Sequence, residues 1–126
     1  MLSLLVWLVG YKMKIVIEGN PKPKIRMTGK SKWSPRAREC LAEQDRIAWI
    51  IKALKLKPIL CDIELDVKFY REGKRRADLS NLIKLLEDGI QYSGLIKNDS
   101  QIIKIIAEVH YESKSPRTEF RINTRL

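Results

Sequence analysis

The chain of 126 residues is long enough for one compact domain, and its apolar content of 44% is too high for a disordered basic tail. Its 25 Lys and Arg outnumber its 15 Asp and Glu and give a formal net charge of +10, which predicts a polyanionic partner such as nucleic acid. The single histidine, His110, argues against His-rich zinc sites and a Ser-His-Asp triad. Any catalysis is therefore expected to depend on carboxylates.

An apolar extension, residues 1–12, precedes the single domain expected at residues 13–126. It contains an apolar run at residues 4–9, which has no basic residues before it and is far shorter than the ~20 residues of a membrane span. The extension is either the product of an upstream start or an additional strand. Cys40 and Cys61 fall within apolar patterns on different elements, which predicts buried thiols and a cytoplasmic protein without a membrane partner.

The first half of the domain is predicted to form a strand, a helix and a second strand. Residues 13–18 alternate as a strand that ends at Gly19-Asn20-Pro21, and residues 59–69 alternate over a longer, half-solvated strand. Ser34 followed by Pro35 predicts the start of a helix that runs to about Lys55. Its core-facing positions are predicted to be Ala37, Leu41, Ile47, Ala48, Ile51 and Leu54.

The second half is predicted to form a helix and two strands. Asp78 stands at the N-cap of a helix that reaches about Tyr92 and stops before Gly94. Residues 101–111 and 118–123 are predicted strands, joined into a hairpin by a turn at residues 113–116. In the first of them Ile103, Ile105, Ala107 and Val109 are expected to face inward. The predicted fold is α+β, with order β-α-β-α-β-β and both long helices packed on one mixed sheet.

Basic side chains gather in two predicted loops, which are the expected source of affinity for DNA phosphates. The first loop carries Lys22, Lys24, Arg26, Lys30 and Lys32, and the second carries Lys74, Arg75 and Arg76. A loop of this composition can equally be a solvated surface without a ligand. Composition alone leaves these two interpretations open.

One face of the second helix carries groups that suit phosphate and metal chemistry. Asn81, Lys84, Asp88 and Gln91 follow one another at spacings of three and four residues, so they lie along one line of the helix surface. The alternative is a capped helix with a Lys84–Asp88 ion pair and no chemical role.

The run from Arg75 to Lys84, followed by Glu87-Asp88-Gly89-Ile90 and by Asn98-Asp99-Ser100-Gln101-Ile102, resembles the signature of the RusA family of Holliday junction resolvases. The first strand and residues 19–26 are similar to the start of that family, so the resemblance covers most of residues 13–122. It implies a homodimeric, Mg²⁺-dependent endodeoxyribonuclease, with Mn²⁺ as a possible substitute, that makes paired nicks in four-way junction DNA during recombination and repair.

The resemblance also implies roles for individual residues. By position, Asp78 and Asp99 correspond to metal ligands and Asp88 to a further family aspartate, which is counted with them as a candidate metal ligand. Lys84 corresponds to the lysine required for cleavage, and Asn81 falls on the family's asparagine. Ser80 departs from the family pattern, which has a second aspartate there, although a serine can still hydrogen-bond a metal-bound water. An inactive basic DNA- or RNA-binding module is the alternative.

The length of the second helix restricts how these aspartates can be combined. Asp78 and Asp88 are ten residues apart, about 15 Å along the axis, so they cannot bind one metal within a chain. Either the following loop returns Asp99 to Asp78, or Asp99 and Asp88 lie near the helix end and a second subunit supplies its Asp78. The second arrangement is our hypothesis, since a two-fold dimer suits a two-fold junction.

Overall fold

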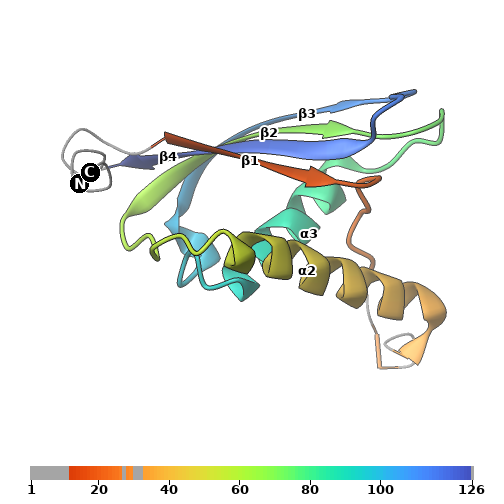
Figure 1. Cartoon of the computed structure of the whole chain (residues 1–126). Coiled ribbons are helices and arrows are strands. Elements are labelled where there is room, and N and C mark those ends of the chain that lie inside the picture. The colour runs from red at the N-terminus through yellow and green to blue at the C-terminus, as the bar shows by residue number, and fades with distance from the viewer. Residues whose placement is uncertain (1–11, 27, 30–32, 126) are drawn as a thin grey trace.

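The computed structural model describes residues 12–26, 28–29 and 33–125. A sheet lies over a layer of two helices (Figure 1). The elements in chain order are β1 (Lys12–Glu18), α2 (Pro35–Ala53), β2 (Asp62–Tyr70), α3 (Leu79–Tyr92), the short 3₁₀ helix η2 (Asp99–Gln101), β3 (Ile102–His110) and β4 (Arg117–Arg125). The predicted α+β class and element order are therefore confirmed. Residues 1–11 of the predicted extension, and Lys30 and Lys32 of the first basic loop, lie outside the described residues.

The four strands are arranged in the order β1-β4-β2-β3. β2 is parallel to β3 and antiparallel to β4, so the predicted hairpin between β3 and β4 is wrong. Their connection instead crosses the end of β2, where Glu112 N donates to Gly73 O at 2.8 Å and Ser113 N to Arg71 O at 2.9 Å. The turn residues specify that the chain reverses, but not which strand the next one joins. β4 pairs along all of β2, so β2 is a central strand with a neighbour on both edges.

The core lies between the sheet and the two helices. The inward side chains of β2, from Ile63 to Phe69, are buried against the helix layer. α2 and α3 pack closely at Gly89 of α3, where a Cβ atom would lie 2.5 Å from Ile47 Cγ2 of α2. A glycine is therefore needed at this crossing. Cys40 and Cys61 are free thiols, the first buried and the second half-buried.

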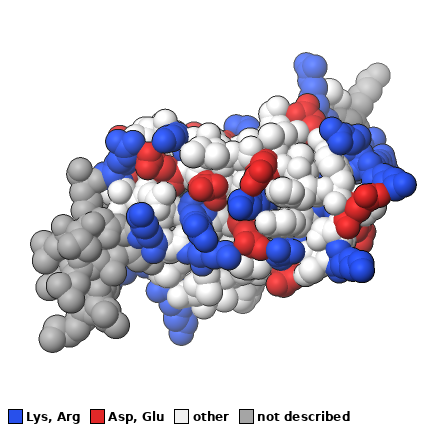
Figure 2. Space-filling model, turned by 90° about the horizontal axis from the view of Figure 1, so that it is seen from above, with Lys and Arg blue, Asp and Glu red and all other residues white. Residues whose placement is uncertain are grey.

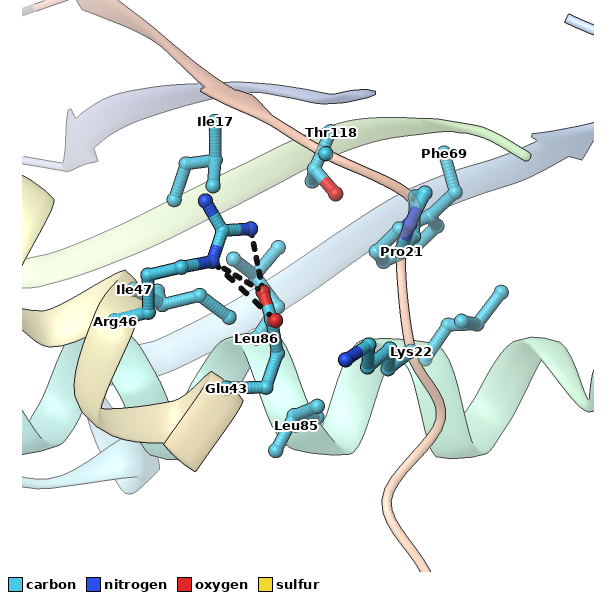
Figure 3. A pocket seen from close by; sticks show the side chains of 12 residues that line it. Ile17, Pro21, Lys22, Glu43, Arg46, Ile47, Phe69, Leu85, Leu86 and Thr118 are labelled. Atoms are coloured by element: carbon cyan, nitrogen blue, oxygen red, sulfur yellow. Dashed lines mark hydrogen bonds and ion pairs between the residues drawn. The ribbon is translucent and has the colours of Figure 1, made fainter. Parts of the chain in front are cut away.

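The buried stripe of α2 differs from the predicted one. Leu41 and Leu54 are 45% and 49% exposed, so their predicted core positions are wrong, and Cys40 and Glu43 are buried instead. Glu43 tolerates burial because Arg46 Nη2 binds its Oε1 at 2.6 Å (Figure 3). Apolar side chains surround this pair, and the enclosed space of about 10 Å³ holds at most one water. This space belongs to the core and not to a ligand site.

In β3, Ile105, Ala107 and Val109 pair with buried residues of β2 and so face the helix layer, as predicted. Ile103 and Ile105 are nevertheless 50% and 38% exposed, and Ile106 is 55% exposed. β3 is one of the two edge strands of the sheet, and a bulge beside Ile63 and Glu64 shifts its register at Ile103. Side chains on an edge strand lack a neighbour on one side, which explains their exposure.

Candidate functional site

A groove with a volume of about 520 Å³ lies beside the N-terminus of α3. It is lined by the loop after β1, the first turns of α2 and the loop between β2 and α3. We call it the basic groove, because Glu39 and Asp78 are its acidic lining residues while seven lining residues are basic: Lys22, Lys24, Arg26, Arg36, Arg71, Arg75 and Arg76. The two predicted basic loops therefore form one surface. Arg36 was not predicted, because it lies in a helix rather than in a basic run.

One buried arginine holds the two loops together. Arg71 Nε donates to Pro21 O at 3.2 Å, and its Nη1 donates to Arg75 O at 3.1 Å. Its guanidinium therefore binds the backbone of both loops instead of facing solvent. This role was not predicted, although Arg71 continues the alternation of inward positions in β2 beyond Phe69.

The first loop is also attached to α3. Lys24 N donates to Asn81 O at 2.9 Å, and the Lys24 ammonium forms an ion pair with Asp88. Both side chains of this pair are partly buried, so the contact anchors the loop along the helix. Asp88 thus has a basic partner of its own, while Lys84 pairs with Asp99.

The second loop is held by Tyr111, which follows β3 and was also missed by the sequence analysis. The Tyr111 hydroxyl accepts from Ala77 N at 3.1 Å and donates to Ala77 O at 3.2 Å. The Arg76 guanidinium lies 4.6 Å from the centre of the tyrosine ring. Lys74 lies at the exposed tip of the loop, 3.7 Å from Glu112, and does not line the groove. Tyr111 therefore fixes the backbone immediately before Asp78.

Asp78 caps α3 and lines the basic groove. Its Oδ1 accepts from Ser80 N at 3.0 Å and from Ser80 Oγ at 2.9 Å. The short side chain of an N-cap aspartate folds onto the first turn in this way. The carboxylate is exposed, and these two bonds leave Oδ2 for another partner. Ser80 thus orients the carboxylate of Asp78.

Asp99 lies in η2, away from the groove. Its Oδ2 is 3.8 Å from Lys84 Nζ, and both side chains are about half exposed. The neighbouring Gln101 fixes this turn: its Nε2 donates to Ile59 O at 2.8 Å and to Cys61 O at 3.0 Å, and its Oε1 accepts from the backbone of residues 97 and 98. Gln101 is therefore the residue that positions Asp99 beside α3.

Glu87 adds a carboxylate to this region that the sequence analysis did not identify. Burial raises the pKa of Glu87, the charges of Asp99 and Asp88 raise it further, and Lys84 acts in the opposite direction. Asp99 is thus associated with the middle and C-terminal part of α3, where Lys84 already lies about 9 Å along the axis from Asp78. Within residues 12–26, 28–29 and 33–125, no three acidic, His or Cys side chains are grouped closely enough to hold a metal.

The face of the sheet opposite the helices has a different electrostatic character. Figure 2 shows this face with basic and acidic side chains interspersed. They form ion pairs between strands, for example Lys14–Glu119 at 3.1 Å and Arg125–Glu64 at 2.7 Å. The Arg125 hydrogen bond is the main reason why the pKa of Glu64 is lowered. The open face of the sheet therefore differs from the basic groove, whose lining has seven basic and two acidic residues.

The family model described as Endodeoxyribonuclease RusA matches residues 15–123. The chain belongs to the RusA family. The predicted resemblance is thereby confirmed, and RusA membership indicates an endodeoxyribonuclease, a hydrolase of the junction-resolving class. No curated protein matches the chain. None of the helices in the described part of this RusA chain is long and apolar enough to cross a membrane.

The candidate site contains carboxylates, which are suitable ligands for a divalent cation. Asp78 and Asp99 are both accessible carboxylates, and hard cations such as Mg²⁺ prefer oxygen ligands. Asp78 lies at the N-terminus of α3 and Asp99 lies in η2 beside Lys84 of that helix, so these two carboxylates are separate within one chain.

Proposed function

We propose that this RusA family chain is an Mg²⁺-dependent endonuclease that hydrolyses phosphodiester bonds in four-way junction DNA during recombination and repair. The observation that carries the proposal is the basic groove, in which cations from three segments surround a solvent-exposed aspartate. A phosphate backbone held by these cations would lie directly against Asp78.

The distribution of charge supports the groove as the DNA-binding surface. Phosphate binding depends on cations that are not already neutralised by neighbouring acids. The open face of the sheet mixes the two signs, as the Lys14–Glu119 and Arg125–Glu64 pairs show, whereas the groove has seven basic lining residues and two acidic ones. DNA is therefore expected to approach from the side of the helices and loops.

Asp78 and Asp99 are the residues that would hold the cation. Mg²⁺ needs only one or two protein carboxylates, because waters and substrate phosphate oxygens complete its coordination. When bound there, it would polarise the scissile phosphodiester and lower the pKa of the attacking water. We give Asp88 a supporting part in this proposal, since its ion pair with Lys24 keeps a basic loop against α3.

Three further side chains have distinct tasks in the proposed reaction. Lys84 lies beside Asp99, where its ammonium can offset the negative charge that develops on the phosphate. Ser80 orients Asp78 through its hydroxyl and backbone N–H. Asn81 accepts from Lys24 N through its backbone oxygen and keeps the first loop in register with the helix.

We further propose that each complete site combines Asp78 of one subunit with Asp99 of its partner. The support is geometric: Asp99 pairs with Lys84, which is six residues beyond Asp78, and not with Asp78 itself. A two-fold dimer in which α3 or β3 faces its symmetry mate would bring opposite ends of these elements together. Two such sites match the two strands that a resolvase cuts.

A cleavage assay tests the proposed function. A synthetic four-way junction is incubated with the protein at increasing Mg²⁺ concentration, beside linear duplex DNA and duplex RNA of the same sequence. We expect symmetric nicks in the junction only when metal is present, and loss of these nicks with retained binding in Asp78→Asn. Metal-independent cutting, or no cutting at any Mg²⁺ or Mn²⁺ concentration, would contradict the proposal.

A second arm of this assay examines the unusual serine. Ser80→Asp introduces the carboxylate that the family pattern has at this position, two residues after Asp78 in the first turn of α3. We expect this variant to reach half-maximal cleavage at a lower Mg²⁺ concentration than the natural chain. The matched variant Ser80→Ala adds no carboxylate and removes the hydroxyl bond to Asp78, so it should not show this gain. An unchanged metal dependence in Ser80→Asp would show that the metal does not bind near Asp78.

A further inference from the structure

Two aromatic side chains are largely exposed at the C-terminal ends of the helices. Trp49 of α2 is 73% exposed, and Tyr92, the last residue of α3, is 63% exposed. Both line a hollow of about 670 Å³, which we call the aromatic hollow and whose lining also includes Asp45, Lys52 and Lys55. These two rings therefore contribute little to the core and face a space that a ligand can enter.

The aromatic hollow adjoins the basic groove along the seam between α2 and α3. A second hollow of about 340 Å³ shares Lys24 with the basic groove and Tyr92 with the aromatic hollow. The two helices pack against each other (Figure 1), and both begin at the groove, which Arg36 and Asp78 line. From Arg36 to Trp49 the surface extends about 20 Å along α2. The three hollows therefore form one continuous surface from Asp78 to Trp49.

The charges of the seam beyond the groove suit an anionic ligand. Lys52, Lys55 and Lys97 are exposed, and none of them forms an ion pair with another described residue. In the second hollow Asp88 is already neutralised by its ion pair with the first basic loop. Asp45 is the remaining acid in the lining of these two hollows. A phosphate chain that follows the seam thus meets three available cations and one available carboxylate.

We propose that the aromatic hollow binds an unpaired DNA strand, whose bases stack on Trp49 and Tyr92 and whose phosphates contact the neighbouring lysines. Proteins that bind single strands combine aromatic rings with a cationic track, because every base has a face that can stack. Bases inside a duplex are stacked on each other and do not reach the rings. The continuity with the groove favours DNA over an acidic polypeptide, since a strand held at Asp78 reaches the rings along the same surface.

The inference deepens the proposed function, on which it rests for the kind of DNA that is cut. It names the favoured substrate as branched DNA with an unpaired stretch beside the crossover. A fully paired arm would contact the basic groove alone.

Binding of a short oligonucleotide tests the stacking. The probe is a labelled oligothymidylate of about 10 nucleotides, and fluorescence anisotropy without divalent metal gives its Kd. We expect Trp49→Ala to raise this Kd about tenfold, and Trp49→Phe to stay within about threefold of the natural value because a ring is kept. Leu41→Ala, at an exposed apolar position on the same helix outside the three hollows, is the matched control and should leave the Kd unchanged.

An abasic oligonucleotide separates stacking from attraction to phosphates. It carries the same phosphates without bases, so the natural chain should bind it at least about tenfold more weakly than the oligothymidylate. Trp49→Ala should not weaken this binding further. Circular dichroism melts establish that each variant is folded. Equal Kd values of the two oligonucleotides for the natural chain, or an unchanged oligothymidylate Kd in Trp49→Ala, would overturn the inference.

The salt dependence of the same binding tests the lysines. Each phosphate contact with a single strand adds about −0.7 to the slope of log K against log salt, so Lys52→Gln should reduce the slope by about 0.7. Lys68→Gln removes an equally exposed lysine from β2, outside the hollows, and is the matched control. An unchanged slope in Lys52→Gln would contradict the role given to the lysines.

Two other occupants of the aromatic hollow give different results. If a second copy of the chain covers it, Trp49→Ala changes the oligomeric state in analytical ultracentrifugation. If an acidic polypeptide occupies it, an oligoglutamate peptide binds as tightly as the oligothymidylate and with the same dependence on Trp49. Either result would overturn the inference.

Junction assays with the same proteins distinguish this inference from the proposed function. The natural chain is expected to bind a junction with an unpaired gap at the crossover about tenfold more tightly than a fully paired one, and Trp49→Ala is expected to bind both alike. If single strands bind as predicted but no junction is cut with metal, the inference stands and the proposed function fails. If junctions are cut and Trp49→Ala binds oligothymidylate as tightly as the natural chain, the function stands and the inference is wrong.

Discussion

The salt dependence of DNA binding provides a quantitative test of the basic groove. Of its seven cations, Lys24 is paired with Asp88 and Arg71 is buried against backbone carbonyls. The remaining five, Lys22, Arg26, Arg36, Arg75 and Arg76, are exposed and available for phosphates. Each neutralised phosphate adds about −0.9 to the slope of log K against log salt, so the five predict a slope of about −4.5 per groove.

This slope corresponds to a large change in affinity. Between 50 and 200 mM salt, the association constant for one groove is expected to fall about 500-fold. Arg75→Gln removes one phosphate contact and should change the slope to about −3.6, which is a fall of about 150-fold over the same range. Fluorescence anisotropy with a labelled four-way junction, without divalent metal so that the DNA stays intact, measures both values.

Arg121→Gln is the matched control, because it removes the same charge from the exposed face of β4 among Lys14, Asp66 and Glu119. It should leave the slope unchanged. Equal effects of Arg75→Gln and Arg121→Gln would refute the assignment of DNA binding to the groove.

Three other substitutions test the packing and the electrostatics. Gly89→Ala forces a methyl group against Ile47 and should destabilise the fold by about 1–3 kcal/mol in denaturant unfolding; an unchanged midpoint would contradict the close helix crossing. Gln101→Leu removes four hydrogen bonds of one side chain and should cost about 2–4 kcal/mol, with cleavage lost beyond any loss of folded protein. Glu87 has a raised pKa, so the folded state binds the proton more tightly, and stability declines as pH rises through that pKa. Without metal, Glu87→Gln should therefore raise the melting temperature at pH 7, and it should leave the melting temperature unchanged at a pH well below the ordinary pKa of 4.5. An equal shift at both pH values would contradict the electrostatic cause.

Local patterns predicted the elements well because the relevant interactions are close in sequence. The Ser34 cap of α2 and the Asp78 cap of α3 involve bonds within three residues, and both form as predicted. The neighbours of each strand depend on contacts between distant segments. For that reason the turn at residues 113–116 was recognised as a reversal, but β2 was not expected between β3 and β4.

The candidate site was predictable to a similar extent. The two basic loops and Asp78 are visible in the sequence, yet their union depends on Arg71, whose role is apparent only from its bonds to two distant carbonyls. The partners of Lys24 and Lys84 were not predictable either. Helical spacing suggested a Lys84–Asp88 pair, but each residue instead pairs with a segment brought to α3 by the fold.

Subunit mixing tests the central claim most directly, namely that the chain cuts junction DNA with carboxylates from two subunits. Asp78→Ala and Asp99→Ala are each inactive in the proposed site, so their homodimers should not cleave. A mixed dimer of the two carries one site with both carboxylates intact, and it is expected to regain junction nicking at about half the natural rate. If each chain supplies a complete site, every site in the mixed dimer is damaged. Absence of any cleavage by verified mixed dimers would then contradict the account.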